Sequence, residues 1–478
     1  MPGCPLTVGF VLSLHPAITT VPCKHFGMVE ATDIGKPAPP AGKLKRTVGT
    51  MLLFFFIVGD TLGAGIYTLI GTMAADVGGM LWLPLVLALV LALLTAGTYA
   101  EMITKYPHAG GACRYVQLAF DRPYPSFVVG FLMLSSGITT SALLANAFAG
   151  DYLSELVDVP AAPVSVAFLL LLIAVNLRGV RESLSANVVM TVIEVSGLVL
   201  VIVVAAIVFG SGQGDPGRIL TPSPDQPILM GAFAASVVAF FSFLGFEAAA
   251  NMAEEVKAPS RAYPRALFGA VCTAGLVYLL IALGAAIVLD PVTIANSSGP
   301  LLEVINASGL AIPGWLFSLI ALVAIANGAL LFMVMASRAT YGLARLGLLP
   351  SVFGRVASRR GTPWVAILAV GLATIGMSFV GNIGQLADTT VLLLVLVFIS
   401  TNISAIVLRK DRVEHDHFSV PIIVPVLALV ASVVLLTQQA AESWLIAFGY
   451  LAVGSVLFLI ARYSRRRLDA EPDRAQDG

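Results

Sequence analysis

The stretch VGDTLGAGIYTLIG, Val58 to Gly71, decides how this chain folds. It lies inside an apolar segment, residues 47–74, that is longer than a straight membrane helix needs, and it places Asp60 among glycines near the middle of that segment. Glycine lowers the cost of unwinding a helix, and an unwound turn leaves backbone N–H and C=O groups free at the centre of the membrane. The stretch therefore predicts a broken helix whose own backbone forms a binding site.

The composition is that of a polytopic membrane protein. Of 478 residues, 58% are hydrophobic and only 11% are charged, and the mean hydropathy is +0.94. No polar stretch between the apolar runs is long enough to form a soluble catalytic domain, so we expect no enzymatic activity. We expect one integral membrane domain, residues 46–463, between a flexible cytoplasmic N-terminal tail, residues 1–45, and a cytoplasmic C-terminal tail, residues 464–478.

Twelve apolar runs are long enough to cross about 30 Å of hydrocarbon, and each ends at a charge, a proline or a glycine. The predicted spans are 47–74, 80–103, 126–150, 161–177, 185–209, 228–252, 265–289, 312–336, 363–381, 386–408, 420–438 and 443–463. If both termini are cytoplasmic, every Lys and Arg except Arg218 falls on the cytoplasmic side, as the positive-inside rule requires. The expected fold is an all-α membrane protein with 12 transmembrane helices in the cell membrane.

Three acidic residues are left inside the predicted spans: Asp60 in the first, Glu194 in the fifth and Glu247 in the sixth. No Lys, Arg or His lies at the same depth. A charge at the membrane centre costs at least about 2–3 kcal/mol, so each of these carboxyl groups is a candidate functional residue.

The sixth span contains a second interruption, in which Gly245 stands between aromatic residues just before Glu247. Two broken helices five spans apart indicate an inverted repeat of five plus five spans. The first repeat would comprise residues 46–209 and the second residues 228–408, with two further helices, residues 420–463, appended.

The first break has opposite electrostatic character on its two sides. The half-helix that begins near Gly65 would direct free N–H groups and the positive end of its dipole at an anion. The carbonyl groups of the unwound turn would attract a cation. A zwitterion that carries a carboxylate and an ammonium group fits both sides.

Four motifs resemble the amino acid, polyamine and organocation (APC) superfamily and occur in the order found there. The first, VGDTLGAGIY, is most similar to the cationic amino acid transporter branch. The others are YPHAGGACRY after the second span, GFEAAANMAEEVKAPSRAYP at the sixth and SRATYGLARLGLLP at the end of the eighth. The resemblance covers most of residues 44–410 and implies alternating access around an amino acid site at the membrane midplane.

The resemblance also implies roles for individual residues at the first break. Thr61, Gly63, Ala64 and Gly65 match the unwound turn whose N–H groups hold the substrate carboxylate. Asp60 is not required by that turn, and it could attract a cationic substrate or carry a proton.

Further positions on both broken helices match the family's site. The carbonyl groups near Ile57 and Val58, together with those of Phe240 and Phe243, match positions that hold the α-ammonium group. Phe241 matches the aromatic residue that closes over the substrate as an external gate. An aromatic ring suits that task because it excludes water with only two rotatable bonds.

The remaining polar residues inside the spans bear on coupling. Glu247 matches an acidic position that exchangers in the family use for pH sensing, but it could equally cap the second half of the broken helix. At the position of Glu194, proton-coupled relatives in the family place a lysine. A buried carboxyl group at this position could itself bind and release a proton. Alternatively, Glu194 could be a structural residue that is hydrogen-bonded between helices. Asn327 could line the site or bond a neighbouring helix, and the middle of its span lacks the hydroxyl ligands that sodium-coupled relatives use.

The charges inside the membrane narrow the class of substrate. Three carboxyl groups without a basic partner favour a cationic or neutral amino acid over an acidic one. A polyamine or organocation transporter is the alternative, and a metal-ion transporter or an amino acid sensor is a weaker one. The expected partners are the substrate, membrane lipids and protons. We expect no cofactor, no metal and no nucleic acid; uniport, symport and exchange remain open.

Overall fold

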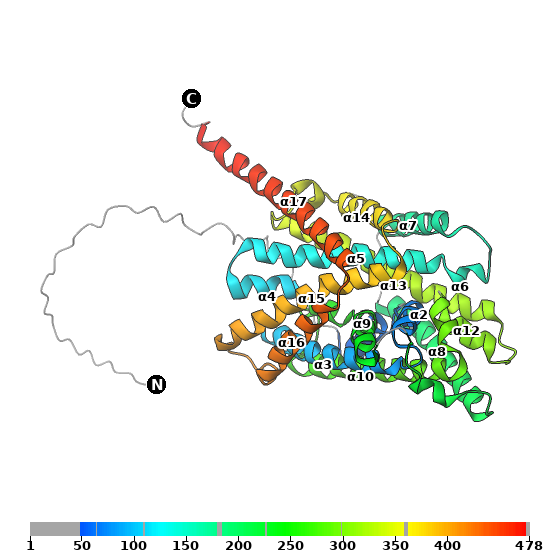
Figure 1. Ribbon diagram of the computed structural model, residues 1–478. Coiled ribbons are helices and arrows are strands. Elements are labelled where there is room, and N and C mark those ends of the chain that lie inside the picture. Colours follow the sequence, from blue (N-terminus) through cyan, green and yellow to red (C-terminus); the bar gives the residue numbers. More distant parts are fainter. Residues whose placement is uncertain are drawn as a thin grey trace, which may run out of the picture. The chain divides into compact units, whose positions relative to one another are not determined.

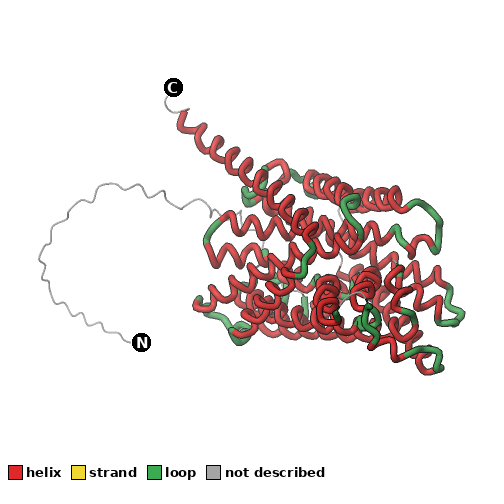
Figure 2. The backbone as a smooth tube through the Cα atoms, in the orientation of Figure 1, coloured by secondary structure: helices red, strands yellow, loops and turns green. Residues whose placement is uncertain are grey.

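The computed structural model describes residues 48–63, 65–108, 110–178, 184–224, 227–297, 299–357 and 362–474. The predicted N-terminal tail and Ala64 in the first predicted break lie outside the described residues. The described chain is helical (Figure 2), and the β-bridge that it contains joins Val48 to Val256.

The described helices follow one another along the chain as separate rods joined by short connections (Figure 1). Their bounds are α1 Thr50–Thr61, α2 Gly65–Val77, α3 Trp82–Lys105, α4 Gly111–Phe120, α5 Pro123–Phe148, α6 Asp151–Ser154, α7 Ala161–Arg178, α8 Leu184–Gly210, η1 Pro216–Leu220, α9 Ile228–Phe241, η2 Phe246–Met252, α10 Pro259–Val288, α11 Pro291–Asn296, α12 Pro300–Ala307, α13 Gly314–Arg345, η3 Ser351–Gly354, α14 Trp364–Met377, α15 Ile383–Val407, η4 Leu408–Lys410, α16 Ile423–Thr437 and α17 Ala441–Arg474.

Among the described residues, eight helices are long and apolar enough to cross a membrane: α3, α5, α7, α8, α10, α13, α15 and α17. The pair α1 and α2 is bent by 42° and makes a ninth if it is counted as one broken span. The helices α9, α14 and α16 are also apolar but shorter. The chain is therefore a multi-pass membrane protein.

Helix α5 is the most enclosed of these long helices. Of the apolar stretch of α5, 89% is buried, whereas only 22% of the apolar stretch of α17 is buried. Helix α5 therefore lies inside the helix bundle and α17 lies at its edge. Helices α5, α13 and α15 run side by side, with α5 packed against both of the others (Figure 1). On another side of the bundle α10 packs against α1, α3 and α8.

The packing brings the two interrupted helices together. Helix α2 packs against α9, and α1 packs against the 3-10 helix η2 that follows α9. The break between α1 and α2 therefore lies against the break between α9 and η2.

Four of the described α-helices lie in the connections and were not predicted: α4, α6, α11 and α12. A hydropathy search finds only runs that can cross a membrane, and these helices are too short or too amphipathic for it. One of them carries a local signal: the side chain of Asp290 accepts the N–H of Val292 at 2.9 Å, and Pro291 stands at the first helical position. An acidic N-cap followed by proline is a typical helix start.

Candidate functional site

The first break begins where α1 ends at Thr61. The N–H of Leu62 still closes a helical turn onto the carbonyl of Val58 at 2.7 Å, after which the chain leaves helical geometry. Helix α2 starts at Gly65. The break therefore falls within the glycine-containing stretch that the sequence singled out.

The second break follows Phe241, the last residue of α9. The chain tightens through i to i−3 hydrogen bonds and turns at Gly245, which has a φ of +119°. The buried carboxylate of Glu247 accepts the N–H of Gly245 at 2.9 Å. Glu247 therefore caps the turn at the head of η2, the structural role left open by the sequence.

Glycine is required where the two breaks touch. A Cβ on Gly245 would lie 2.8 Å from the carbonyl oxygen of Asp60, and one on Gly65 would lie 3.0 Å from the Cα of Ser242. A Cβ on Gly59 would lie 2.0 Å from the hydroxyl oxygen of Thr191 on α8. These three positions let backbone approach backbone, or backbone approach a side chain, more closely than any larger residue would permit.

A cavity lies at the junction of the two breaks. Its volume of about 30 Å³ is enough for about two water molecules. Seven of the residues proposed from the sequence line it: Asp60, Thr61, Gly63, Gly65, Glu194, Phe241 and Asn327. This volume is smaller than an amino acid.

The other residues proposed from the sequence lie outside the lining, apart from Ala64, which is not described. Ile57 and Val58 are buried within α1, and the carbonyl of Val58 already accepts a backbone N–H. The ring of Phe240 packs edge-on against Phe398, and the ring of Phe243 packs edge-on against Tyr278. All four residues are buried and do not line the cavity.

Glu194 is the most enclosed carboxyl group of the cavity, with no exposed surface. Neither carboxylate oxygen has a partner within hydrogen-bonding geometry among the described residues, although the amide of Asn327 is close enough to interact with the group. Asp60 is near enough for the two carboxylates to repel each other. Repulsion between two nearby carboxylates is relieved when one of them is protonated.

An aromatic cluster fixes α2 against its neighbours beyond the break. The hydroxyl of Tyr67 donates to the backbone carbonyl of Glu194 at 2.7 Å, and the hydroxyl of Tyr152 donates to the carbonyl of Tyr67 at the same distance. The ring of Phe317 lies 6.2 Å from that of Tyr67, centre to centre. This cluster ties α2 to the helix that carries Glu194.

Several lining residues were not found from the sequence: Gly59, Leu144, Ser242, Leu244, Gly328, Leu331 and Phe332. Ser242 is the informative omission, because it is the polar residue that follows the predicted gate Phe241. Ser242 directly follows the last residue of α9, so a prediction that placed the second break after Phe241 would have included it.

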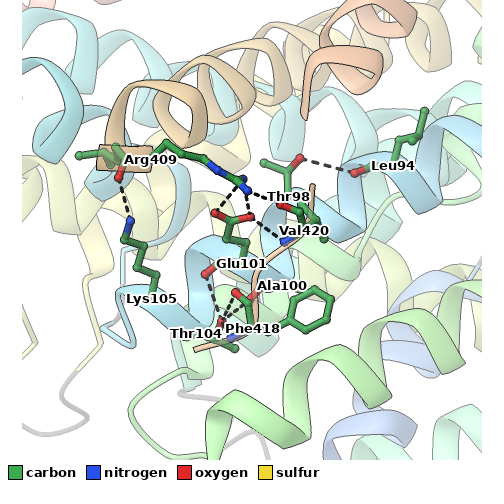
Figure 3. A network of polar contacts seen from close by, with 10 residues as sticks. Leu94, Thr98, Ala100, Glu101, Thr104, Lys105, Arg409, Phe418 and Val420 are labelled. Atoms are coloured by element: carbon green, nitrogen blue, oxygen red, sulfur yellow. Dashed lines mark hydrogen bonds and ion pairs between the residues drawn. The ribbon is translucent and has the colours of Figure 1, made fainter. Parts of the chain in front are cut away.

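A fourth carboxyl group, Glu101, is also buried within a predicted span, which corrects the count of three (Figure 3). It accepts from the guanidinium of Arg409 at 3.3 Å and from the N–H of Val420 at 2.9 Å. Lys105 on the same helix donates to the carbonyl of Leu408 at 2.8 Å. The partners of Glu101 lie more than 300 residues away in the chain, so no local sequence pattern indicates that it is buried and paired. The cluster joins the end of α3 to the segment between α15 and α16 and is separate from the cavity.

The fold and the cavity define a multi-pass membrane protein with a polar site enclosed between two interrupted helices. The model of the amino acid permease family matches residues 48–460, so the chain belongs to that family, within the APC superfamily.

Three relatives show the range of the similarity. The methylthioribose transporter of Bacillus subtilis is 28% identical over 447 residues, which cover 88% of this chain and 94% of the relative. The vacuolar cationic amino acid transporter 4 of Arabidopsis thaliana is 29% identical over 385 residues, 77% of this chain and 64% of the relative. A branched-chain amino acid permease of Bacillus subtilis is 25% identical over 457 residues, 88% of this chain and 94% of the relative.

Proposed function

We propose that the chain is a secondary active transporter that moves cationic or neutral amino acids across the cytoplasmic membrane by alternating access. The observation that carries this proposal is the cavity at the junction of the two breaks, where helix ends, two carboxyl groups and an amide converge. Family membership makes an amino acid the first candidate.

The backbone around the cavity suits both charges of an amino acid. Helix α2 begins at Gly65, so the positive end of its dipole faces the cavity and would bind the substrate carboxylate. Helices α1 and α9 end at Thr61 and Phe241, so the negative ends of their dipoles face the cavity and would bind the ammonium group. A zwitterion placed between them would interact favourably with the dipoles of all three helices.

The side chains select against an acidic substrate. Asp60 and Glu194 both border the cavity, and a substrate with a second carboxylate would add another negative charge at low dielectric. Relatives named for cationic and branched-chain amino acids fit this selection. A polyamine or another organocation is the alternative, because it would also be attracted by the two carboxyl groups.

We assign proton coupling to Glu194. The carboxyl group of Glu194 is buried and accepts no hydrogen bond from the described residues, so uptake of a proton stabilises it. A positively charged substrate group beside it would favour release of that proton. Glu247 is the second pH-sensitive group in this proposal, because protonation would weaken its bond to the N–H of Gly245 and loosen the second break.

The proposed topology has twelve spans with both termini in the cytoplasm. The eight long helices, the bent pair and the three short apolar helices overlap the twelve predicted segments one to one, which supports this count. The distribution of Lys and Arg supports the orientation.

The proposal is tested by uptake of radiolabelled arginine and leucine into liposomes that contain the purified protein. Lysine, neutral amino acids, putrescine and methylthioribose serve as competitors under proton, sodium and no gradient. We expect inhibition by cationic or neutral amino acids and acceleration by an inward proton gradient. Uptake of neither amino acid, or inhibition by putrescine or methylthioribose alone, would contradict the proposed substrate class.

Glu194→Gln tests the coupling, with Glu155→Gln on a connecting segment as the matched control. We expect Glu194→Gln to retain exchange and to lose the response to an imposed pH step, whereas Glu155→Gln keeps both. If Glu194→Gln accumulates substrate after the pH step as the wild type does, Glu194 is a structural residue.

A further inference from the structure

Tyr278 joins the two breaks from a third helix. It lies on α10 with no exposed surface, and its hydroxyl is hydrogen-bonded to the backbone carbonyl of Thr61 and to that of Ser242, the latter at 2.9 Å. Its ring packs edge-on against Phe243, with the ring centres 5.2 Å apart. One side chain therefore contacts the backbone at the ends of both α1 and α9.

Both carbonyl groups need such a donor. The last carbonyls of a helix have no N–H partner within it, and leaving one buried without a partner is unfavourable. Thr61 is the last residue of α1 and Ser242 is the C-cap of α9. Among the described residues, no backbone N–H outside the helices donates to either carbonyl. The single O–H of the phenol lies within hydrogen-bonding distance of both carbonyl oxygens, which share it as their donor.

The same two residues, Thr61 and Ser242, belong to the lining of the cavity. Within the part of the chain that the structure describes, neither of their hydroxyl oxygens has a hydrogen-bonding partner, and both oxygens are buried. Each residue is 2% exposed. The hydroxyl oxygen of Ser242 lies 3.2 Å from the point where a Cβ on Gly65 would stand, which puts it beside the start of α2. The backbone oxygens of these residues are thus held by Tyr278, while their side-chain hydroxyls remain available to a ligand.

We propose that Tyr278 is a positioning residue for substrate: its hydroxyl fixes the backbone of Thr61 and Ser242, and so directs their two free hydroxyls at the substrate. Ser242 then contributes a hydroxyl donor beside the N–H groups of α2, where the substrate carboxylate binds. The phenol has a single proton and two carbonyl acceptors. The same hydroxyl group therefore fixes the distance between the end of α1 and the end of α9. This inference rests on the proposed function, because it concerns the affinity of the same cavity.

The test compares Tyr278→Phe with Tyr263→Phe in the liposome uptake assay. Tyr263 is the matched control, because it lies on the same helix, is equally buried and donates its hydroxyl to one backbone carbonyl, that of Ala249, at 2.9 Å. We expect Tyr278→Phe to raise KM about tenfold with an unchanged maximal rate, since one buried hydrogen bond sets the site geometry. Tyr263→Phe should leave KM unchanged. Equal KM values for Tyr278→Phe and wild type, or the same change in both variants, would overturn the inference.

Ser242→Ala provides the second measurement. We expect it to raise KM at least about threefold, and we expect Tyr278→Phe to raise KM less in the Ser242→Ala background than in the wild type. Additive effects would show that Tyr278 does not act through Ser242 and would overturn that step. Should Tyr278→Phe yield no folded protein, an unchanged KM in Ser242→Ala overturns the inference by itself. Absence of uptake in the wild type refutes the proposed function, whereas normal wild-type uptake with unaltered variants refutes only the role of Tyr278.

Discussion

Gly245→Ala is the substitution that tests the contact between the two breaks most sharply. Gly245 has a φ of +119°, and its missing side chain makes room for the backbone of Asp60. Alanine changes no charge and adds a single methyl group. Its effect therefore reports only on backbone conformation and on space.

Two penalties add at this position. A non-glycine residue held in a sparsely populated backbone region costs about 1–3 kcal/mol. A Cβ 2.8 Å from the carbonyl oxygen of Asp60 must also push the two breaks apart, and overpacking of this kind costs about 1–3 kcal/mol. The two penalties together should destabilise the native arrangement of the breaks by about 2–6 kcal/mol. A free-energy change of 1.4 kcal/mol already alters an equilibrium constant by a factor of about ten.

The assays are thermal unfolding in detergent and amino acid uptake into liposomes. We expect Gly245→Ala to unfold at a lower temperature than the wild type and to lose at least about tenfold in uptake. Gly342→Ala on α13 is the control, because a Cβ there meets nothing within 4 Å. It should be neutral or slightly stabilising. Wild-type stability and uptake in Gly245→Ala would refute the proposed packing of the breaks.

Three further predictions follow from other contacts. Gly65→Ala should reduce uptake more than Gly63→Ala in the same liposome assay, because a Cβ on Gly65 meets neighbours at 3.0–3.3 Å whereas one on Gly63 meets nothing closer than 3.4 Å; equal losses would contradict this. Glu101→Ala should lower the unfolding temperature by removing an acceptor for Arg409, a loss of about 1.5–3 kcal/mol, while Glu101→Gln should lower it less; no shift in either variant would argue against the cluster. Burial raises the pKa of the Cys113 thiol to about 11. A protein with Cys113 as its sole cysteine should therefore react with maleimide at pH 7.5 about a hundredfold more slowly than the unfolded chain. Rapid labelling would show that α4 does not pack as described.

Much of the fold could be predicted because a membrane constrains each helix separately. A run that must cross the hydrocarbon has to be apolar and long, so α3, α5 and α10 are visible in the sequence without knowledge of their neighbours. The first break was equally visible, because glycines and an aspartate inside such a run have a local meaning. The predicted Asp60, Glu194 and Asn327 do border one cavity.

The rest depends on contacts between distant residues. Tyr278 and Ser242 look ordinary in the sequence, and their importance appears only when a hydroxyl on α10 meets carbonyls that lie 217 and 36 residues away. The buried state of Glu101 likewise depends on Arg409. Val58 and Phe240, whose carbonyls the family resemblance assigns to the ammonium group, are not among the residues that line the cavity, and each of these carbonyls accepts a backbone N–H of the turn that follows it. A pattern of residue types cannot specify where such a turn ends.

The central claim is that the amino acid occupies the cavity between the two breaks, and protection of a cysteine from labelling tests it most directly. Leu331→Cys, in a protein whose four native cysteines are replaced by serine, puts a thiol on the cavity wall, and Gly342→Cys puts one on the same helix away from it. With a transported amino acid present at saturating concentration, labelling of the Leu331→Cys variant by a methanethiosulfonate reagent should slow severalfold, whereas labelling of Gly342→Cys should not change. Unchanged labelling at both positions by an amino acid that the protein demonstrably transports would place the substrate elsewhere and contradict the account.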